Sequence, residues 1–195
     1  TLSVGTYADC TITVSKTIAT EKSEKKLSGS LTITSFTVSS SDDSSSDDSS
    51  SANPISAGQY NSCAILGNAS VKCWGRNNKG QLGIDNITQM GDNTGEMAQL
   101  TGINLGTGRT ATSISGSNVH NCALLDNASV KCWGHGLNGR LGQGNPNDLG
   151  NGANEMGDNL PSIDLGTGRT ATAIAAGGAH SCAILDNGSV KCWGK

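Results

Sequence analysis

Six of the seven cysteines stand in three pairs, and oxidation to disulfides is the chemistry that their spacing favours. In each pair the cysteines are ten positions apart, and an apolar run, a turn centred on asparagine and a second short run separate them. This order is typical of a β-hairpin whose strands hold the two cysteines opposite each other, within disulfide reach. The expected disulfides are Cys63–Cys73, Cys122–Cys132 and Cys182–Cys192.

Zinc binding and free buried thiols are the alternatives for these six cysteines. Zinc ligands usually come as closely spaced Cys or His pairs, and the sequence has no Cys-x-x-Cys. A thiol can also pack as a small apolar group in a core. The sequence favours disulfides, each of which would stabilise the fold by roughly 3 kcal/mol in the chain-entropy model. Disulfides imply an oxidising compartment.

Four asparagines are candidate glycosylation sites, because each begins an Asn-x-Ser or Asn-x-Thr sequence. Three of them are the turn residues of the hairpins. Asparagine is also common in tight turns for conformational reasons alone. We nevertheless expect a glycan on at least one of the four if the chain follows a eukaryotic secretory route. The candidates are Asn68, Asn86, Asn127 and Asn187.

The histidines do not form a catalytic or metal-binding set. His120 and His180 occupy matching positions, and the first copy has Asn61 there, which favours hydrogen bonding over metal or proton chemistry. His135 has no carboxylate at a useful spacing in the sequence. No Ser-based nucleophile motif is present either. The sequence therefore predicts no catalytic residue, no metal site and no cofactor, and we expect a protein that is not an enzyme.

The glycine-rich Gly106–Arg109 is only superficially like a phosphate loop. A strand-like Ala-Thr-Ser-Ile follows it, where a phosphate site would need the N-terminus of a helix. Arg109 and its counterpart Arg169 are instead expected to bond backbone carbonyls or acidic loop residues.

The elements that position these residues are repeated. The segments Asn61–Gly75, His120–Gly134 and His180–Gly194 are near-copies, and Leu-Gly-Thr-Gly-Arg-Thr-Ala-Thr occurs both at 105–112 and at 165–172. Such a fixed period indicates an array of stacked supersecondary units. A residue that recurs in every unit is expected to belong to the scaffold, so one tryptophan per copy is interpreted as core: Trp74, Trp133 and Trp193.

The repeats resemble those of the regulator of chromosome condensation family, in its cysteine-containing, extracellular type. The residues that carry the resemblance are Cys-Trp-Gly, then Gly-Gln-Leu-Gly at 80–83 or Gly-Arg-Leu-Gly at 139–142, then Leu-Gly-Thr-Gly-Arg-Thr, over residues 54–195. The resemblance implies blades of a β-propeller. The family's best-known activity, nucleotide exchange on the GTPase Ran, belongs to a closed propeller, whereas this chain has two complete repeats and a third that stops after Lys195.

The expected fold is all-β: a partial propeller-like array at 54–195, divided as 54–114, 115–174 and 175–195, with a separate strand pair at 1–38. In that pair Cys10 alternates with apolar residues, which favours a buried thiol over an intermolecular disulfide, and a change of phase at Ser35 suggests a bulge. A Ser/Asp-rich linker at 39–53 lacks the apolar residues that folding needs.

Composition excludes several function classes. Only 3% of the residues are aromatic, so the core needs support such as disulfides. A net charge of −3 without a basic run argues against nucleic acid as a partner. No apolar stretch is long enough for insertion into a membrane. The chain starts at Thr1 without a signal peptide, which is typical of a processed product or a fragment.

Incomplete propellers expose sheet edges, and exposed edges recruit other strands. The sequence therefore predicts a non-enzymatic, extracellular or cell-surface structural subunit that assembles with copies of itself into a fibre or surface appendage. The alternative is a secreted propeller-type module that presents its Asn/Asp/Gly-rich inserts to a protein ligand. A guanine nucleotide exchange factor is a distant alternative.

Overall fold

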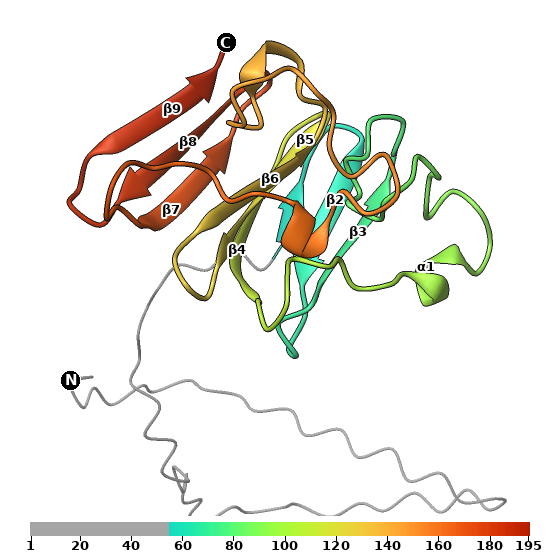
Figure 1. Cartoon of the computed structure of the whole chain (residues 1–195). Helices are drawn as coiled ribbons and strands as arrows, with labels where there is room; N and C mark the ends of the chain where they lie inside the picture. Colours follow the sequence, from blue (N-terminus) through green and yellow to red (C-terminus); the bar gives the residue numbers. More distant parts are fainter. Residues whose placement is uncertain (1–54) are drawn as a thin grey trace, which may run out of the picture. The chain divides into compact units, whose positions relative to one another are not determined.

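The computed structural model describes residues 55–195 (Figure 1). The predictions made for the N-terminal strand pair, Cys10 and the Ser/Asp-rich linker lie outside these residues. Within them the fold is all-β, as expected, and consists of three antiparallel three-stranded sheets. The strands are β1 (Ile55–Ala57), β2 (Asn61–Ile65) and β3 (Val71–Gly75); β4 (Ala111–Gly116), β5 (His120–Leu125) and β6 (Val130–Gly134); β7 (Ala171–Ala176), β8 (His180–Leu185) and β9 (Val190–Gly194).

Helix is confined to single turns in the long inserts that connect the sheets. These are α1 (Glu96–Gln99) and the 3₁₀ turns η1 (Leu137–Gly139) and η2 (Gly157–Asn159). Each insert also returns to the sheet that it leaves: Met90 forms a single antiparallel bridge with Gly75, and Leu149 forms one with Gly134. The bridge extends the outer edge of β3 or β6 by one residue pair, which anchors the middle of the insert.

The second and third sheets each begin with the strand that follows Leu-Gly-Thr-Gly-Arg-Thr. β4 and β7 start at Ala111 and Ala171 and pair with the hairpins that come after them. The repeat boundary expected at residue 114 therefore falls inside β4, and the second and third sheets start four residues earlier than the expected repeats at 115 and 175. As a result the third sheet has all three of its strands.

The hairpin turns are built around the asparagines that the sequence singles out. Asn68 Oδ1 accepts hydrogen bonds from the N–H and the hydroxyl of Ser70, and Leu66 N–H donates to Ser70 O. The residue after the asparagine has a positive φ: 59° at Ala69, 60° at Ala128 and 78° at Gly188. This turn brings the cysteines of each hairpin into direct register, for example Cys63 opposite Cys73. All three expected disulfides are present.

The sheets lie side by side, with β4–β6 between the other two (Figure 1). Two apolar clusters fill the two spaces between them. The first contains Leu82, Ile114, Leu125 and Trp133, and the second contains Leu124, Val130, Leu141 and Leu185. The disulfide of the first sheet belongs to the first cluster and that of the second sheet to the second. These two disulfides therefore each pack against the next sheet along the chain, which compensates for the scarcity of aromatic residues.

Candidate protein-binding surface and the junctions that position it

A backbone carbonyl in the Gly-Gln-Leu-Gly turn joins the first sheet to the second. Gln81 O accepts hydrogen bonds from Trp133 Nε1 at 3.1 Å and from Asn121 Nδ2 at 2.7 Å. The same Asn121 Nδ2 lies 3.0 Å from Asn61 Oδ1 on β2. All four residues except Asn61, which is 3% exposed, have no measurable exposure. The buried carbonyl of this turn therefore holds the first and second sheets at a fixed distance from each other.

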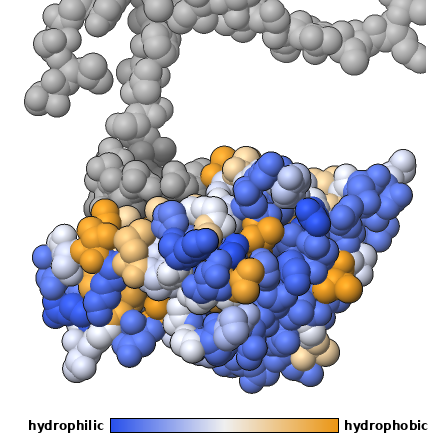
Figure 2. All heavy atoms as spheres, turned by 90° about the horizontal axis from the view of Figure 1, so that it is seen from above, coloured by the Kyte–Doolittle hydropathy of each residue, from blue (hydrophilic) through white to orange (hydrophobic). Residues whose placement is uncertain are grey.

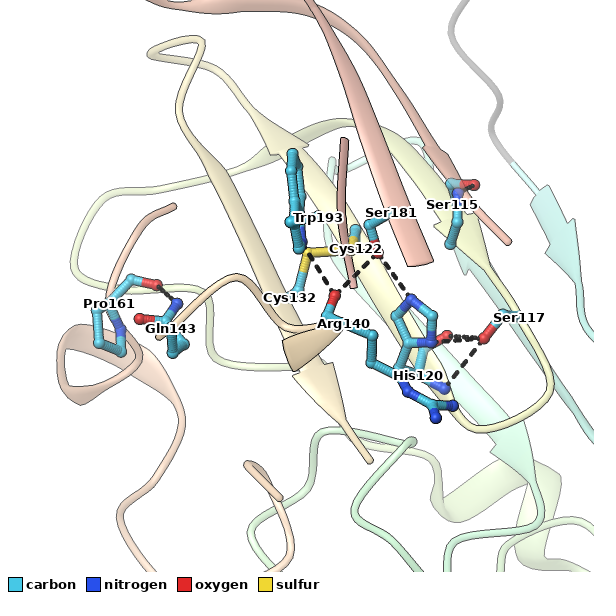
Figure 3. Close-up of a disulfide and its surroundings, with 11 residues drawn as sticks. Ser115, Ser117, His120, Cys122, Cys132, Arg140, Gln143, Pro161, Ser181 and Trp193 are labelled. Atoms are coloured by element: carbon cyan, nitrogen blue, oxygen red, sulfur yellow. Dashed lines mark hydrogen bonds between the residues drawn. A yellow bond between two sulfur atoms is a disulfide. The ribbon is translucent and has the colours of Figure 1, made fainter. Parts of the chain in front are cut away.

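The second sheet is joined to the third in the same way (Figure 3). Arg140 O accepts hydrogen bonds from Trp193 Nε1 and from Ser181 Oγ, both at 3.0 Å. Ser181 Oγ also lies 2.8 Å from Nε2 of His120 on β5, and His120 Nδ1 lies 2.7 Å from Ser117 Oγ. The inner strands add one bond per junction: Gly116 N–H donates to Ser56 Oγ in the first, and Ala176 N–H donates to Ser115 Oγ in the second.

Two glycines in these turns allow the tryptophans to pack closely. A Cβ at Gly83 would lie 2.8 Å from Trp133 Nε1, and one at Gly142 would lie 2.9 Å from Trp193 Nε1. The Gly-x-Leu-Gly motif is thus the surface on which the next tryptophan sits. The interpretation of the tryptophans as core holds fully for Trp133, which is buried, whereas Trp74 and Trp193 are half-buried.

His120 acts as a neutral hydrogen-bonding residue. Burial, followed by the charges of Arg140, His180 and His135, lowers its pKa from 6.5 to about 4. The expected hydrogen-bonding role is correct for His120, and Asn61 has the same role in the first sheet. The expectation that the bond stays within a turn is incomplete, because both side chains also bond across a junction. His180, at the matching position of the third sheet, is exposed.

The two arginines of the Leu-Gly-Thr-Gly-Arg-Thr motif bond acidic turn residues, one of the two outcomes expected. Arg109 pairs with Asp126 at 3.3 Å and Arg169 pairs with Asp186 at 3.2 Å. Each aspartate also accepts a hydrogen bond, at 3.1 Å, from the N–H of the threonine that follows the arginine, Thr110 or Thr170. These pairs hold the entry to β4 and β7 against the hairpin turns, and they leave no arginine of the motif facing a ligand.

An open, shallow polar cleft of about 610 Å³ lies on the surface between the inserts. The face of the molecule in Figure 2 is covered mostly by hydrophilic residues, with apolar residues gathered in small patches. The cleft combines Lys79 of the first insert, which directly precedes the Gly-Gln-Leu-Gly turn, with residues of the second insert. It is lined by Lys79, His135, Leu137, Pro146, Asn147, Asp148, Leu149, Asn151 and Glu155.

Asp148 is the electrostatic centre of this cleft. Its carboxylate lies 3.3 Å from Lys79 Nζ, accepts the Gly136 N–H at 2.9 Å, and lies 3.9 Å from His135 Nε2. Burial lowers the pKa of His135, with Asp148 opposing that shift and Arg140 and Lys79 adding to it. His135 is therefore neutral at neutral pH, and its contact with Asp148 is not an ion pair there. The prediction that His135 has no carboxylate partner is wrong, because the fold of the second insert brings Asp148 to it.

A glutamate closes each insert loop. In the second insert, Glu155 Oε2 accepts the N–H groups of Asn151 and Gly152 at 2.9 and 2.8 Å. The N–H groups of Glu155 and Met156 in turn donate to Asp85 of the first insert. The wall of the cleft is thereby tied to the neighbouring insert.

In the first insert, Glu96 Oε2 accepts three backbone N–H groups, from residues 91 to 93. Hydrogen bonds from the side chain and backbone of Asn93 and from Gly91 lower the pKa of Glu96 to about 2. The loop around Glu96 is therefore held by a carboxylate that stays charged over the whole physiological range.

The remaining predicted sites lie on the surface of the hairpins and the first insert. The side-chain oxygens of Asn68, Asn127 and Asn187 are used in their turns, and all three residues are exposed. Asn86 differs, since its Nδ2 donates to Ile84 O. Glycosylation at these positions stays a prediction. Among residues 55–195 no three His, Cys, Asp or Glu side chains gather where they could hold a metal ion. In the same residues no helix has the length and apolar character that crossing a membrane requires.

Comparisons with known proteins agree with this architecture. The model of the regulator of chromosome condensation (RCC1) repeat matches residues 55–81 and 171–195. The ultraviolet-B receptor UVR8 of Arabidopsis thaliana is 34% identical over 142 residues, which are 72% of this chain and 29% of that protein. The human E3 ubiquitin-protein ligase HERC2 is 28% identical over 143 residues, 72% of this chain and 3% of the ligase.

Solved structures show the same fold. Human WBSCR16 aligns with a TM-score of 0.57 at 16% identity, over 72% of this chain and 32% of that one. Prp20p from Saccharomyces cerevisiae aligns with a TM-score of 0.52 at 20% identity, over 72% and 32%. The chain spans less than a third of the length of each of these proteins. The described part of this chain is therefore an array of RCC1-like β-propeller repeats.

Proposed function

We propose that residues 55–195 form a non-enzymatic protein-binding module, with the cleft between the inserts as its contact surface. The observation that carries the proposal is the construction of the cleft: Asp148 and Glu155 are fixed by backbone N–H groups and by Lys79. Leu137 stands on its rim with 49% of its surface exposed. A preorganised polar surface with an apolar anchor is the usual composition of a protein interface.

The relatives support a role in binding proteins. The structure of Prp20p was described together with its binding to Gsp1p and histones, and yeast RCC1 (Prp20) was solved bound to Kap60. A partner for the present cleft needs donors for the Asp148 and Glu155 carboxylates and an apolar recess for Leu137. This chemistry favours a protein surface with Lys or Arg beside a small hydrophobic pocket.

A matched pair of substitutions tests the cleft. Leu137→Arg places a charge on the rim, whereas Leu66→Arg places the same charge on a hairpin turn outside the cleft, where Leu66 is 40% exposed. Each variant is used to capture partners from the native source, with cross-linking to locate the contact. The proposal requires that Leu137→Arg lose a partner that Leu66→Arg keeps. Equal capture by both variants contradicts it.

We also propose, as a second candidate, that the chain is an extracellular subunit that associates with copies of itself. Three disulfides support an oxidising compartment. The third sheet exposes apolar residues that the first two sheets bury: Val190 is 61% exposed, whereas its counterparts Val71 and Val130 are at most 1% exposed.

Sedimentation of the full chain across a range of concentrations tests self-association. We expect a concentration-dependent shift toward larger species that Val190→Lys removes. A monomer that is stable to dilution contradicts the self-association proposal and leaves the binding proposal intact. Intact mass before and after glycosidase treatment tests the glycans separately.

A further inference from the structure

A segment of the second insert, Met156–Leu160, is bound by the second repeat through its backbone. Gly157 N–H donates to Asn104 O at 3.0 Å. The ammonium group of Lys131 bridges the two backbone segments, since it donates to Leu105 O and to Gly157 O, both at 2.8 Å. The residues that bind the segment, here called the receiving residues, are therefore those of the loop that leads into β4, together with Lys131 of β6.

The side chains of the same segment are also bound. Asp158 accepts two hydrogen bonds from Thr107, from its N–H at 2.8 Å and from its hydroxyl at 2.6 Å. These bonds, with the Lys131 charge as a smaller contribution, lower the pKa of Asp158. Met156 is 4% exposed and Leu160 is 1% exposed. A Cβ at Gly83 would lie 3.1 Å from Met156 Cε and 2.8 Å from Trp133 Nε1, so the glycine turn and the indole line the methionine site.

The third repeat has the same receiving residues. Asp164-Leu-Gly-Thr167 corresponds to Asn104-Leu-Gly-Thr107, and Lys191 corresponds to Lys131. Asp164 Oδ1 accepts the Gly166 N–H at 2.8 Å, as Asn104 Oδ1 accepts the Gly106 N–H at 3.0 Å. The loop is therefore folded in the same way at both places.

In the third repeat these residues line an open pocket of about 410 Å³. Gly142, Ile163, Leu165, Lys191 and Trp193 are among its walls. A Cβ at Gly106 would lie 2.9 Å from Asp158 Oδ1 and 3.2 Å from Lys131 Nζ, whereas one at Gly166 would lie 3.0 Å from Lys191 Nζ. Within the described residues, Lys191 thus has the position of Lys131, but no carboxylate stands beside it as Asp158 does. The volume is in the range of sites that hold small ligands or a few side chains.

We propose that this pocket binds an extended peptide segment of the pattern Met-Gly-Asp-x-Leu that lies outside the described residues 55–195. The apolar side chain enters between Gly142 and Trp193, as Met156 enters between Gly83 and Trp133. The aspartate of the segment receives the N–H and hydroxyl of Thr167, and Lys191 bonds the carbonyl of its glycine. The Asp164 carboxylate, which replaces the neutral Asn104, weakens the attraction for the incoming aspartate, and the Lys191 charge offsets it.

Met156–Leu160 of a second copy cannot serve as the bound segment while that copy stays folded, because Met156 and Leu160 are already buried in their own repeat and Asp158 is already bound by Thr107. The bound segment is therefore an acidic, Gly-containing one outside residues 55–195. The pocket shares no residue with the cleft between the inserts.

The test uses a fluorescent peptide with the sequence of residues 154–161, Asn-Glu-Met-Gly-Asp-Asn-Leu-Pro, titrated with the full chain. Saturable binding is expected. Replacing the peptide's aspartate by asparagine should weaken it about tenfold or more, since a hydrogen bond to a charged group contributes about 1.5–3 kcal/mol. Lys191→Met in the protein should weaken binding similarly, and Lys72→Met, the matching lysine of the first repeat, should leave the affinity unchanged.

Absence of saturable binding at millimolar peptide overturns the proposal. So does an affinity that is the same for the aspartate and asparagine peptides, or one that Lys72→Met reduces as much as Lys191→Met. Leu137→Arg should bind the peptide normally, because the cleft is a separate surface. The experiments can therefore contradict the proposal for the cleft without contradicting the proposal for the pocket, and the reverse.

Discussion

The two junctions between sheets have the same geometry but different chemistry. In each, a residue on the earlier sheet bonds a residue on the later sheet, which bonds the carbonyl of the Gly-x-Leu-Gly turn. The first junction uses Asn61 and Asn121, and the second uses His120 and Ser181. A longer side chain on one sheet is balanced by a shorter one on the other, so the spacing between the sheets is kept.

The difference gives the junctions different sensitivities. Amide side chains do not titrate, so the hydrogen bonds of the first junction are indifferent to pH. The imidazole of His120 can be protonated, and both of its nitrogens are held by hydroxyl groups inside the protein. The first junction has another weakness, because the buried Asn121 Oδ1 has no hydrogen-bond partner among the described residues. The same backbone arrangement thus accommodates two sets of side chains: one contains a group that titrates, and the other contains that unpaired buried oxygen.

The largest expected effect is a loss of stability that differs between Trp133 and Trp193. Trp133→Ala removes a fully buried indole and leaves a cavity in the first junction, which should lower the free energy of unfolding by about 3–5 kcal/mol. Trp193→Ala should cost less, because Trp193 is half-buried. Urea denaturation of both variants measures the difference. Equal losses would mean that the two junctions contribute alike in spite of their different burial.

The next effect depends on pH. The folded-state pKa of His120 is about 4, below its ordinary value of 6.5, so between these values the unfolded chain binds more protons. Its stabilising contribution is complete above pH 6.5 and is lost as the pH falls toward 4. The loss is on the order of 3 kcal/mol for a shift of this size. Urea denaturation at steps of pH measures it.

A swap of the junction chemistry identifies the source of that loss. The double variant His120→Asn with Ser181→Asn gives the second junction the residues of the first, and should reduce the acid sensitivity. His135→Asn serves as the control, since burial also lowers the pKa of His135 from 6.5, so this residue too loses stabilising contribution as the pH falls below 6.5. If the double variant loses as much stability between pH 6.5 and 4 as the original chain, His120 is not the titrating group.

The smallest effect compares the hairpin turns. Ala128 has a φ of 60°, and the third hairpin has Gly188 at the matching position with a φ of 78°. Because glycine adopts this conformation without strain, Ala128→Gly should raise the free energy of unfolding slightly, and Gly188→Ala should lower it by about 1 kcal/mol. Thermal denaturation of the two variants provides the measurement. A stabilising Gly188→Ala would show that the loss of chain entropy outweighs the strain.

Local patterns were sufficient to predict the hairpins. The symmetric spacing around Asn68 and its counterparts predicted the strand pairing and the position of the cysteines, because a hairpin depends on residues close in sequence. The pairing of Arg109 with an acidic turn residue also follows from a short-range arrangement.

The contacts between sheets could not be predicted from the repeated sequence motifs. Nothing in the motif around Gln81 indicates that its carbonyl would accept two side chains from the next repeat. The partnership of His135 with Asp148 depends on the path of an insert that has little periodicity. The return of Met156–Leu160 to the loop before β4 joins residues some fifty positions apart. Such contacts depend on packing between units. The Met that follows the loop glutamate in both inserts does not indicate them, because Met156 is buried whereas Met97 is 49% exposed.

The placement of the disulfides within hairpins has a consequence for oxidative folding. Six cysteines allow fifteen connectivities, and the near-identity of the repeats offers little chemical basis for choosing among them. Each native partner is ten positions away, whereas the nearest cysteine of another repeat, Cys122 from Cys73, is 49 positions away. The entropy of loop closure therefore favours the native pair by about 1.4 kcal/mol, or roughly tenfold, before any sheet has formed. Mispaired isomers are disfavoured by chain length alone, so the repeats can remain almost identical in sequence without being cross-linked to one another.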